Sequence, residues 1–349
     1  MIYFDNIIFS LQSAGGISSV WSNLIQNINL NDDSIRYIEY DNVYQNLFRK
    51  ECHIPPEQLI ILKHFNKIFS QFSHPQIKNE QNFIFHSSYF RTCNNPNAIN
   101  VTTLHDFIYE QGNPTWKERL RIAMNYRAVR KSDVIVCVSE NTKNDLLKFI
   151  PDVDPAKVHV IYNGVSEAYF KMDTVPYPEY RDYVLFVGGR QGYKNFDFTV
   201  RAVENSKYRL LVCGSPLNSG EKKLLDESLE NRYKIMEYPT NAELNKVYNS
   251  VFCLAYPSSY EGFGIPILEA QRCGCPIIAM LSSSVPEVMG AGGIMMDKLV
   301  LNDFENALAK LEETSSRKEL INAGLENVKR FSWKKMAEEY LALYNSILN

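Results

Sequence analysis

Short apolar segments alternate with segments of helical periodicity along the chain, and this alternation limits the fold more than any other sequence feature. Strands that alternate with helices are typical of parallel βαβ units. The expected strands in the first half span residues 2–9, 36–40, 59–62, 83–86, 99–104, 133–138 and 158–161. Those in the second half span residues 183–187, 208–213, 234–237, 251–256, 276–280 and 293–296. We therefore expect an α/β fold.

The chain of 349 residues is long enough for two such domains with separate cores. Residues 172–179 are polar and spaced by prolines, as in a linker. We expect an N-terminal domain over 1–172, a second domain over 181–330, and an amphipathic terminal helix over 331–349 that packs across to the first domain. Two doubly wound domains that face each other would bring the carboxyl ends of both sheets to one cleft, where ligands bind.

Composition excludes several classes of protein. The net charge of −3 argues against a dedicated nucleic-acid binder, which usually has a strong basic excess. No apolar run approaches the ~20 residues of a membrane-spanning helix, and the start of the chain has no basic segment of a secretory signal. The seven cysteines are scattered, and several lie in apolar strands, as in a reducing compartment. We expect a cytoplasmic enzyme.

Residues 261–269, with the sequence EGFGIPILE, carry the strongest chemical signal. An apolar strand leads into this segment, and Pro266 stands where a helix would begin, because its missing N–H would be unpaired there anyway. Glu261 then lies in a glycine-bearing loop and Glu269 about one turn into the helix. The bare N–H groups of a helix start attract anions. Two carboxylates beside such a start suit a ligand rich in hydroxyls and phosphate, which describes a sugar nucleotide.

A second glycine-bearing loop, with the sequence GGRQGYKN over residues 188–195, follows the strand 183–187. Glycine lets the backbone approach a ligand closely, and Gly189 stands beside Arg190. Arg190 and Lys194 supply two cations, enough to neutralise a diphosphate. The alternative is a turn with two solvated charges, and the neighbouring carboxylate motif favours the binding function.

Three further positions follow strands in the first half. Gly15-Gly16 precedes a helix and could bring backbone N–H groups towards phosphates, although it is not the dinucleotide fingerprint. His105 ends the strand 99–104, at the edge of the sheet where ligands of open α/β folds bind. His86 ends the strand 83–86 and is the competing candidate.

Neither a metal site nor a membrane anchor is evident. Asp152-Val153-Asp154 is the single Asp-x-Asp, and the prolines on both sides indicate an exposed turn. Since Arg190 and Lys194 can balance a diphosphate, we expect no metal. Cations crowd a predicted helix over 117–131 that follows Trp116, namely Lys117, Arg119, Arg121, Arg127, Arg130 and Lys131. A solvated helix face is one interpretation, and docking on an anionic membrane or a lipid-linked diphosphate is the other.

Together these segments resemble the retaining glycosyltransferases of family 4, which have the GT-B fold of two facing Rossmann-like domains with a cleft between them and a C-terminal helix that crosses back. The likeness spans nearly the whole chain, and residues 261–269 match the family's Glu-x7-Glu motif. The other segments in the family's order are Gly15-Gly16, His105-Asp106, 138–142, 162–165, Gly189-Arg190 with Lys194-Asn195, and 286–288. The segments around His86 and His105 resemble a branch common in bacterial O-antigen and capsule gene clusters, often labelled mannosyltransferase.

The resemblance implies a role for each candidate residue. Glu269 would hold the ribose hydroxyls of the donor nucleotide, and Glu261 the hydroxyls of the transferred sugar. Arg190 and Lys194 would clamp the diphosphate, and His105 would touch the sugar near its reacting face. The other donor contacts would be Gly16, Gly189, Gly262, Phe263, Gly264 and Ile265.

The resemblance also implies retaining transfer by front-face attack, without cofactor or metal. The donor would be GDP-mannose or a UDP-sugar, and the acceptor a glycan or a polyprenyl-diphosphate-linked oligosaccharide of surface polysaccharide synthesis. The base stays open, because Tyr238-Pro239-Thr240 stands where many relatives have a glycine.

Two alternatives use the same fold. A sugar-nucleotide epimerase needs several acid and base groups around the sugar, and the first domain offers few: His105, Asp106 and Glu140. A non-catalytic nucleotide-sugar-binding module is disfavoured because Arg190, Lys194, Glu261 and Glu269 are costly to hold together without a ligand.

Overall fold

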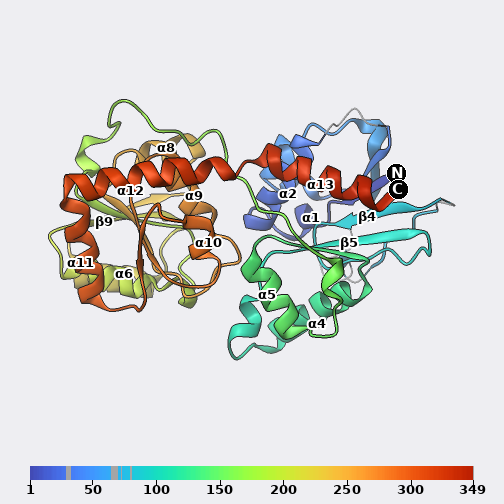
Figure 1. Ribbon diagram of the computed structural model, residues 1–349, viewed down its shortest axis with the longest axis horizontal. Helices are drawn as coiled ribbons and strands as arrows, with labels where there is room; N and C mark the ends of the chain where they lie inside the picture. Colours follow the sequence, from blue (N-terminus) through green and yellow to red (C-terminus); the bar gives the residue numbers. More distant parts are fainter. Residues whose placement is uncertain (29–32, 64–69, 72, 79–80, 349) are drawn as a thin grey trace. The chain divides into compact units, whose positions relative to one another are not determined.

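A computed structural model describes residues 1–28, 33–63, 70–71, 73–78 and 81–348 (Figure 1). The chain forms two compact units, one made of Met1–Gly164 with Trp333–Asn349 and the other of Val165–Ser332. The division thus falls at Gly164, and residues 165–172, which we assigned to the first domain, lie in the second unit.

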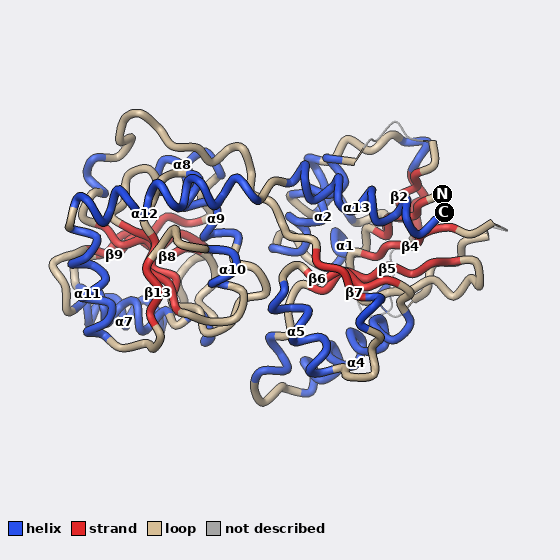
Figure 2. Tube along the Cα trace, in the orientation of Figure 1, coloured by secondary structure: helices blue, strands red, loops and turns tan. Residues whose placement is uncertain are grey.

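The described part of the first unit contains a seven-stranded parallel sheet in the order β3-β2-β1-β4-β5-β6-β7. Its strands are β1 (Ile2–Asp5), β2 (Ile35–Tyr40), β3 (Leu59–Leu62), β4 (Phe83–Ser87), β5 (Ala98–Leu104), β6 (Val134–Cys137) and β7 (Val158–Val160). Its α-helices include α1 (Ile8–Leu11), α2 (Gly16–Asn27), α4 (Trp116–Lys131), α5 (Glu140–Phe149) and α13 (Trp333–Leu348). Helices α2 and α13 pack together over the sheet, and α4 and α5 lie on its other side (Figure 2).

The described part of the second unit contains a six-stranded parallel sheet in the order β10-β9-β8-β11-β12-β13. Its strands are β8 (Tyr183–Val187), β9 (Arg209–Gly214), β10 (Tyr233–Glu237), β11 (Cys253–Tyr256), β12 (Ile277–Met280) and β13 (Ile294–Met296). Its helices are α6 (Phe196–Glu204), α7 (Ser219–Leu229), α8 (Asn241–Tyr248), α9 (Ile265–Arg272), α10 (Val285–Met289), α11 (Leu301–Glu312) and α12 (Thr314–Asn327). Side chains of α6, α7 and α11 share one core with the sheet.

The prediction of two Rossmann-like α/β domains is confirmed, and one expected strand is wrong. The first strand stops at Asp5 rather than at residue 9, and the chain turns into the short helix α1. Ile7, Ile8 and Phe9 stay buried in that helix, so the apolar run continues although the strand does not. An apolar run cannot distinguish a buried strand from a buried helix. The other expected strands end within two residues of those observed.

The terminal helix α13 belongs to the first unit and is joined to its sheet by two buried tyrosines. The Tyr344 hydroxyl lies 2.6 Å from Nδ1 of His86 on β4, and the Tyr340 hydroxyl lies 2.9 Å from Oγ1 of Thr103 on β5. His86 also lies 2.8 Å from Thr103 through Nε2 and has no exposed surface. Both ring nitrogens of His86 are therefore engaged within the core.

The segment after Gly164 is hydrogen-bonded to the rest of the second unit. The backbone N–H of Phe170 donates to Oδ1 of Asn245 at 3.0 Å, and that of Met172 donates to Oδ1 of Asn249 at 2.8 Å. Both asparagines lie at the end of α8, so side chains fix a stretch that has no regular structure of its own. In the part of the chain that the structure describes, we find no helix with the length and apolar character to cross a membrane.

Candidate donor-binding site

The centre of the second sheet is a topological switch point. The chain leaves β8 towards β9 on one side, whereas β11 lies on the other side of β8. Ligands of open α/β sheets bind at such points, outside the carboxyl ends of the strands. The loop 188–194 follows β8 and the loop 257–264 follows β11. The fold therefore brings together the two segments that carry most of the predicted donor contacts.

Lys194 and Glu261 form an ion pair between these loops. The Lys194 ammonium lies 2.6 Å from Oε1 of Glu261, and the side chains keep 17% and 12% of their surfaces exposed. The ammonium also lies 5.7 Å from the centre of the Tyr256 ring at the end of β11. Burial, followed by the charge of Glu261, raises the pKa of the Tyr256 phenol. The cation and the carboxylate are thus juxtaposed and still reachable from solvent.

The loop that carries Glu261 is held by serines that sequence analysis did not single out. Ser283 Oγ accepts from the backbone N–H of Glu261 at 2.7 Å. Ser284 Oγ donates to the backbone oxygens of Glu261 and Phe263, both at 2.9 Å. Gly264 then starts α9 with φ of 107°, a conformation that L side chains rarely adopt. This turn places the start of α9, at Ile265, in the chain four residues after Glu261.

Asn195 links the β8 loop to the β11 loop. It adopts a left-handed φ of 50°, and its Nδ2 donates to the backbone oxygen of Pro257 at 2.8 Å and to Ser259 Oγ at 2.6 Å. Gly188 at the end of β8 also has a positive φ, of 103°, whereas Gly189 does not. The two loops are therefore a single hydrogen-bonded structure in which Lys194 has a defined position.

Glu269 lies on α9 beside two tyrosines. The Tyr248 hydroxyl donates to Glu269 Oε2 at 2.9 Å, and the buried Tyr169 ring packs edge to face on that of Tyr248. Burial raises the pKa of Glu269 to about 7, against the lowering effect of the two phenols. Neither tyrosine was predicted, because nothing in the local sequence around residues 169 and 248 points to a site.

Arg190 is turned away from the Lys194–Glu261 pair. Its Nη2 donates to the backbone oxygens of Ser215 and Pro216 at 3.0 and 2.8 Å, and its Nε lies 2.9 Å from Oε2 of Glu221. Only 3% of its side chain is exposed. In this structure Arg190 therefore holds the start of α7, whereas Lys194 pairs with Glu261.

In the first unit, His105 follows β5 and Gly16 starts α2, as the sequence predicts. Burial lowers the pKa of the His105 imidazole to about 4, so the ring is neutral at pH 7. A Cβ on Gly16 would have no neighbour within 4 Å, so the backbone there borders open space. His86, the competing histidine, is a core residue that anchors α13, and burial lowers its pKa to about 3.

Two buried ion pairs follow the first strands, and sequence analysis missed them. Asp5 at the end of β1 pairs with Arg91, and neither side chain has more than 1% of its surface exposed. Glu39 on β2 pairs with Arg49 at 2.6 Å and accepts from Asn6 Nδ2 at 2.7 Å. Charged side chains that are buried this deeply are almost always paired. These pairs hold the side chains of Asp5 and Asn6 at the end of β1.

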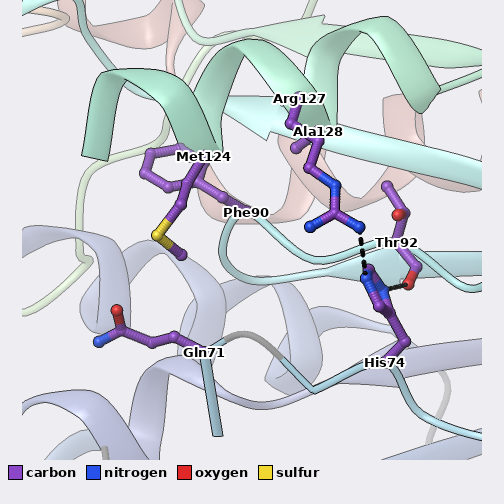
Figure 3. Close-up of a pocket in the computed structure, with 7 residues that line it drawn as sticks. All are labelled: Gln71, His74, Phe90, Thr92, Met124, Arg127 and Ala128. Carbon is purple, nitrogen blue, oxygen red and sulfur yellow. Dashed lines mark hydrogen bonds between the residues drawn. The ribbon is translucent and has the colours of Figure 1, made fainter. Parts of the chain in front are cut away.

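A small cavity of about 20 Å³ lies beneath α4, and none of the residues that line it is a predicted donor-site residue (Figure 3). His74 lies between Thr92 and Arg127, with Nδ1 2.6 Å from the Thr92 backbone oxygen and Nε2 3.0 Å from Arg127 Nη2. Because a carbonyl only accepts, Nδ1 carries the proton and Nε2 accepts from Arg127. These polar groups satisfy one another.

The basic helix is α4, and its predicted cations are exposed. Arg130 pairs with Asp152 at 2.8 Å, and Asp154 caps a short 3-10 helix by accepting from Ala156 N–H at 2.9 Å. The Asp-x-Asp segment is thus a solvated turn in which one carboxylate forms an ion pair and the other caps a helix. Among the described residues, no three His, Cys, Asp or Glu side chains gather as a metal site would require.

Two family models match adjoining parts of the chain. A model described as glycosyltransferase family 4 matches residues 46–169, and one described as glycosyl transferases group 1 matches residues 171–327. The first covers most of the first unit, and the second covers the candidate site around Glu261 and Glu269.

Individual proteins are similar at low identity. The chain is 23% identical over 296 residues to an O-antigen chain mannosyltransferase B of Escherichia coli, covering 77% of this chain and 75% of that protein. It is 24% identical over 266 residues to a D-inositol 3-phosphate glycosyltransferase of Corynebacterium glutamicum, covering 69% of this chain and 63% of that protein. Among solved structures, Anabaena Alr3699/HepE in complex with UDP-glucose matches with a TM-score of 0.75 at 14% identity, over 99% of both chains. The last likeness concerns the fold alone.

Proposed function

Because the chain belongs to the family 4 and group 1 glycosyltransferases, we propose that it transfers a sugar from a nucleoside-diphosphate sugar with retention at the anomeric carbon. The observation that carries this proposal is the Lys194–Glu261 pair at the switch point, on the same side of the sheet as the start of α9 and Glu269. A cation and a helix start suit a diphosphate, and two carboxylates suit sugar and ribose hydroxyls.

The chemistry follows from where charge develops. The bond between the anomeric carbon and the phosphate oxygen breaks, so negative charge grows on the departing diphosphate. Lys194 and the N–H groups at residues 263–265 would stabilise that charge, and each well-placed donor is typically worth about 3 kcal/mol. The acceptor attacks from the side of the leaving group, and the departing phosphate oxygen takes its proton. Glu261 would hold the transferred sugar while positive charge develops on its ring.

Arg190 is proposed as the second diphosphate contact, which requires it to leave its present partners. Its bonds to Ser215, Pro216 and Glu221 would be exchanged for charge-assisted bonds to phosphate. Gly189 and Gly262 would complete the donor contacts, with Gly16 and His105 contributing from the first unit. A neutral His105 suits contact with sugar hydroxyls, since it can donate and accept.

For the substrates we propose GDP-mannose or a UDP-sugar as donor and a glycan or polyprenyl-diphosphate-linked acceptor. The name of the E. coli relative, an O-antigen chain mannosyltransferase, supports mannose as the transferred sugar and a glycan as the acceptor. The relative named for D-inositol 3-phosphate supports a polar phosphorylated acceptor instead. We also propose that the enzyme works at the inner face of the plasma membrane, with α4 on the lipid surface.

The test is transfer from radiolabelled GDP-mannose and UDP-sugars to lipid-linked glycan acceptors, with excess EDTA or with Mg²⁺. We expect transfer that persists in EDTA and is lost in Lys194→Ala. His105→Ala should transfer far less while its nucleotide affinity stays within about tenfold. An epimerised donor without transfer would identify an epimerase, binding alone would identify a non-catalytic module, and activity restored only by Mg²⁺ would contradict metal independence.

A further inference from the structure

Two buried tyrosines lie beside Glu269, and each comes from a different part of the chain. Tyr248 is the last residue of α8, and its hydroxyl donates to Oε2 of Glu269 at 2.9 Å. Tyr169 lies on the segment that enters the second unit, and its phenol, like that of Tyr248, lowers the pKa of Glu269. The two rings meet edge to face, with their centres 5.9 Å apart.

Neither tyrosine can leave this position easily. Tyr248 is 1% exposed and Tyr169 is 3% exposed. The backbone of Tyr169 is fixed as well, because Arg272 Nε donates to its carbonyl oxygen at 2.8 Å and the next N–H is bonded to Asn245. Glu269 and Arg272 lie on α9, so the entering segment and the helix that carries the carboxylate are joined.

The two phenols are not equivalent donors. A phenol has one proton, and the Tyr169 hydroxyl donates its proton to Asn241 Oδ1 at 3.1 Å. Tyr248 has Glu269 as its acceptor. Tyr248 is therefore the tyrosine that donates to the carboxylate.

We propose that Tyr248 and Tyr169 are positioning residues that orient the Glu269 carboxylate for the donor and hold it in its charged form, with Tyr248 the stronger. This proposal rests on the proposed function, in which Glu269 binds the donor ribose. The other groups that face this cluster are Tyr256 from β11 and Cys273 from α9, and both are themselves buried. Each of these two groups would become negatively charged on ionisation, so neither stabilises the ionised form of Glu269.

Removal of the Tyr248 hydroxyl should raise the pKa of Glu269. Burial raises the pKa of Glu269 to about 7, and the phenols oppose that rise. Tyr248→Phe removes one stabilising bond to the charged form, so the pKa rises further. A hydrogen bond to a charged group corresponds to about one pH unit. Nucleotide binding that needs the ionised carboxylate would then begin at higher pH.

The experiment is titration calorimetry of GDP and UDP with the full chain, from pH 5.5 to 9, for wild type, Tyr248→Phe, Tyr169→Phe and Tyr177→Phe. Tyr177 is the matched control, since it lies on the same entering segment and its ring packs on Tyr180 instead. Titration of the nucleotide's own phosphate is common to all four proteins and cancels in the comparison. We expect the pH midpoint of binding to rise by about one unit in Tyr248→Phe, by less in Tyr169→Phe, and not at all in Tyr177→Phe.

At pH 9, where Glu269 is largely ionised in all four proteins, any affinity that Tyr248→Phe still lacks measures the loss of the orienting contact. An unchanged pH midpoint in Tyr248→Phe, with or without an equal loss of affinity at every pH, would overturn the proposal, because a merely structural tyrosine would not move the midpoint. Glu269→Gln separates the two proposals. If it abolishes the pH dependence while Tyr248→Phe does nothing, the tyrosine proposal alone fails. If it leaves nucleotide binding and its pH dependence unchanged, the proposed donor site fails.

Discussion

At the residue scale, the Lys194–Glu261 pair joins two loops whose paired residues are 67 positions apart in the chain. Both residues were chosen from their motifs, and they meet at 2.6 Å because β8 and β11 are neighbours in the sheet. Arg190 was chosen for the same reason, yet its guanidinium holds Ser215 and Pro216. The sequence specifies which residues are charged, whereas contacts between distant segments determine which residue each of them pairs with. That is also why Tyr169 and Tyr248 could not be predicted.

Substitution of the two carboxylates should separate donor binding from turnover. Ribose contacts are similar in the ground and transition states, so Glu269→Ala should chiefly raise KM. Contacts to the reacting sugar strengthen as its ring becomes cationic, so Glu261→Ala should chiefly lower kcat, by about tenfold or more. Steady-state kinetics over a range of donor concentrations measures both. The reverse assignment would mean that the two carboxylates have exchanged roles.

Tyr238 offers a test of backbone strain. It follows β10 with φ of 47° and 71% of its surface exposed, so its conformation is costly and its ring contributes little burial. Tyr238→Gly and Tyr238→Ala both delete the ring, but only glycine adopts this φ without strain. We expect the glycine variant to be more stable than the alanine variant by about 1 kcal/mol in urea unfolding. Equal stabilities would show that residue 238 relaxes to another conformation.

At the scale of elements, fully buried parallel strands were the easiest to predict and element ends the hardest. Strands such as β4 and β6 are buried throughout and therefore appear as unbroken apolar runs. The same burial made the predicted end of the first strand wrong, because Ile7 to Phe9 are equally buried but belong to a helix. The prolines of residues 172–179 suggested a linker, but asparagine side chains of α8 bind the preceding backbone. Such contacts are between distant segments and have no local signature.

Helix α13 should depend on its buried tyrosine hydroxyls. Tyr344→Phe would leave Nδ1 of His86 without its 2.6 Å partner inside the core, and an unsatisfied buried group costs about 1–3 kcal/mol. We expect a loss of that size in urea unfolding. Ser346→Ala on the same helix is the control, since Ser346 Oγ is exposed and bonds only the Leu343 carbonyl, and it should change stability by less than about 0.5 kcal/mol. Similar effects of both variants would contradict the role of the buried bond.

Helix α4 should bind anionic lipid if its exposed first turns face a membrane. Trp116 and Leu120 are 72% and 44% exposed on a helix whose cations are also exposed, a combination suited to the lipid interface. Each cation near an anionic surface contributes about 1 kcal/mol, so Lys117→Ala with Arg119→Ala should weaken vesicle binding more than tenfold. Co-sedimentation with phosphatidylglycerol vesicles measures this. Lys222→Ala, an exposed cation of α7, should have no effect, and equal weakening by it would indicate unspecific attraction.

At the scale of the whole molecule, the order of segments in space differs from their order along the chain. The first unit is built from both ends of the sequence, and the second from the continuous stretch between them. The sequence predicted this arrangement through the amphipathic pattern of residues 331–349 and through the family resemblance, which implies a C-terminal helix that crosses back. The last helix and the first strand of the chain contribute to the same core of the first unit, because Phe4 on β1 packs against Tyr344 on α13 with ring centres 6.0 Å apart.

Removal of residues 333–349 should therefore unfold the first unit and spare the second. The deleted helix buries Trp333, Met336, Tyr340 and Tyr344. Four large side chains at about 1.5–3 kcal/mol each amount to much of a domain's stability of about 5–15 kcal/mol. We expect calorimetry of the truncated chain to show one transition, still raised in temperature by the nucleotide that the full chain binds, since Lys194, Glu261 and Glu269 belong to the second unit, whose core is intact. Transfer should be lost, because Gly16 and His105 lie in the unfolded part. A truncated protein that keeps both transitions and its transferase activity would show that α13 is dispensable for the first core.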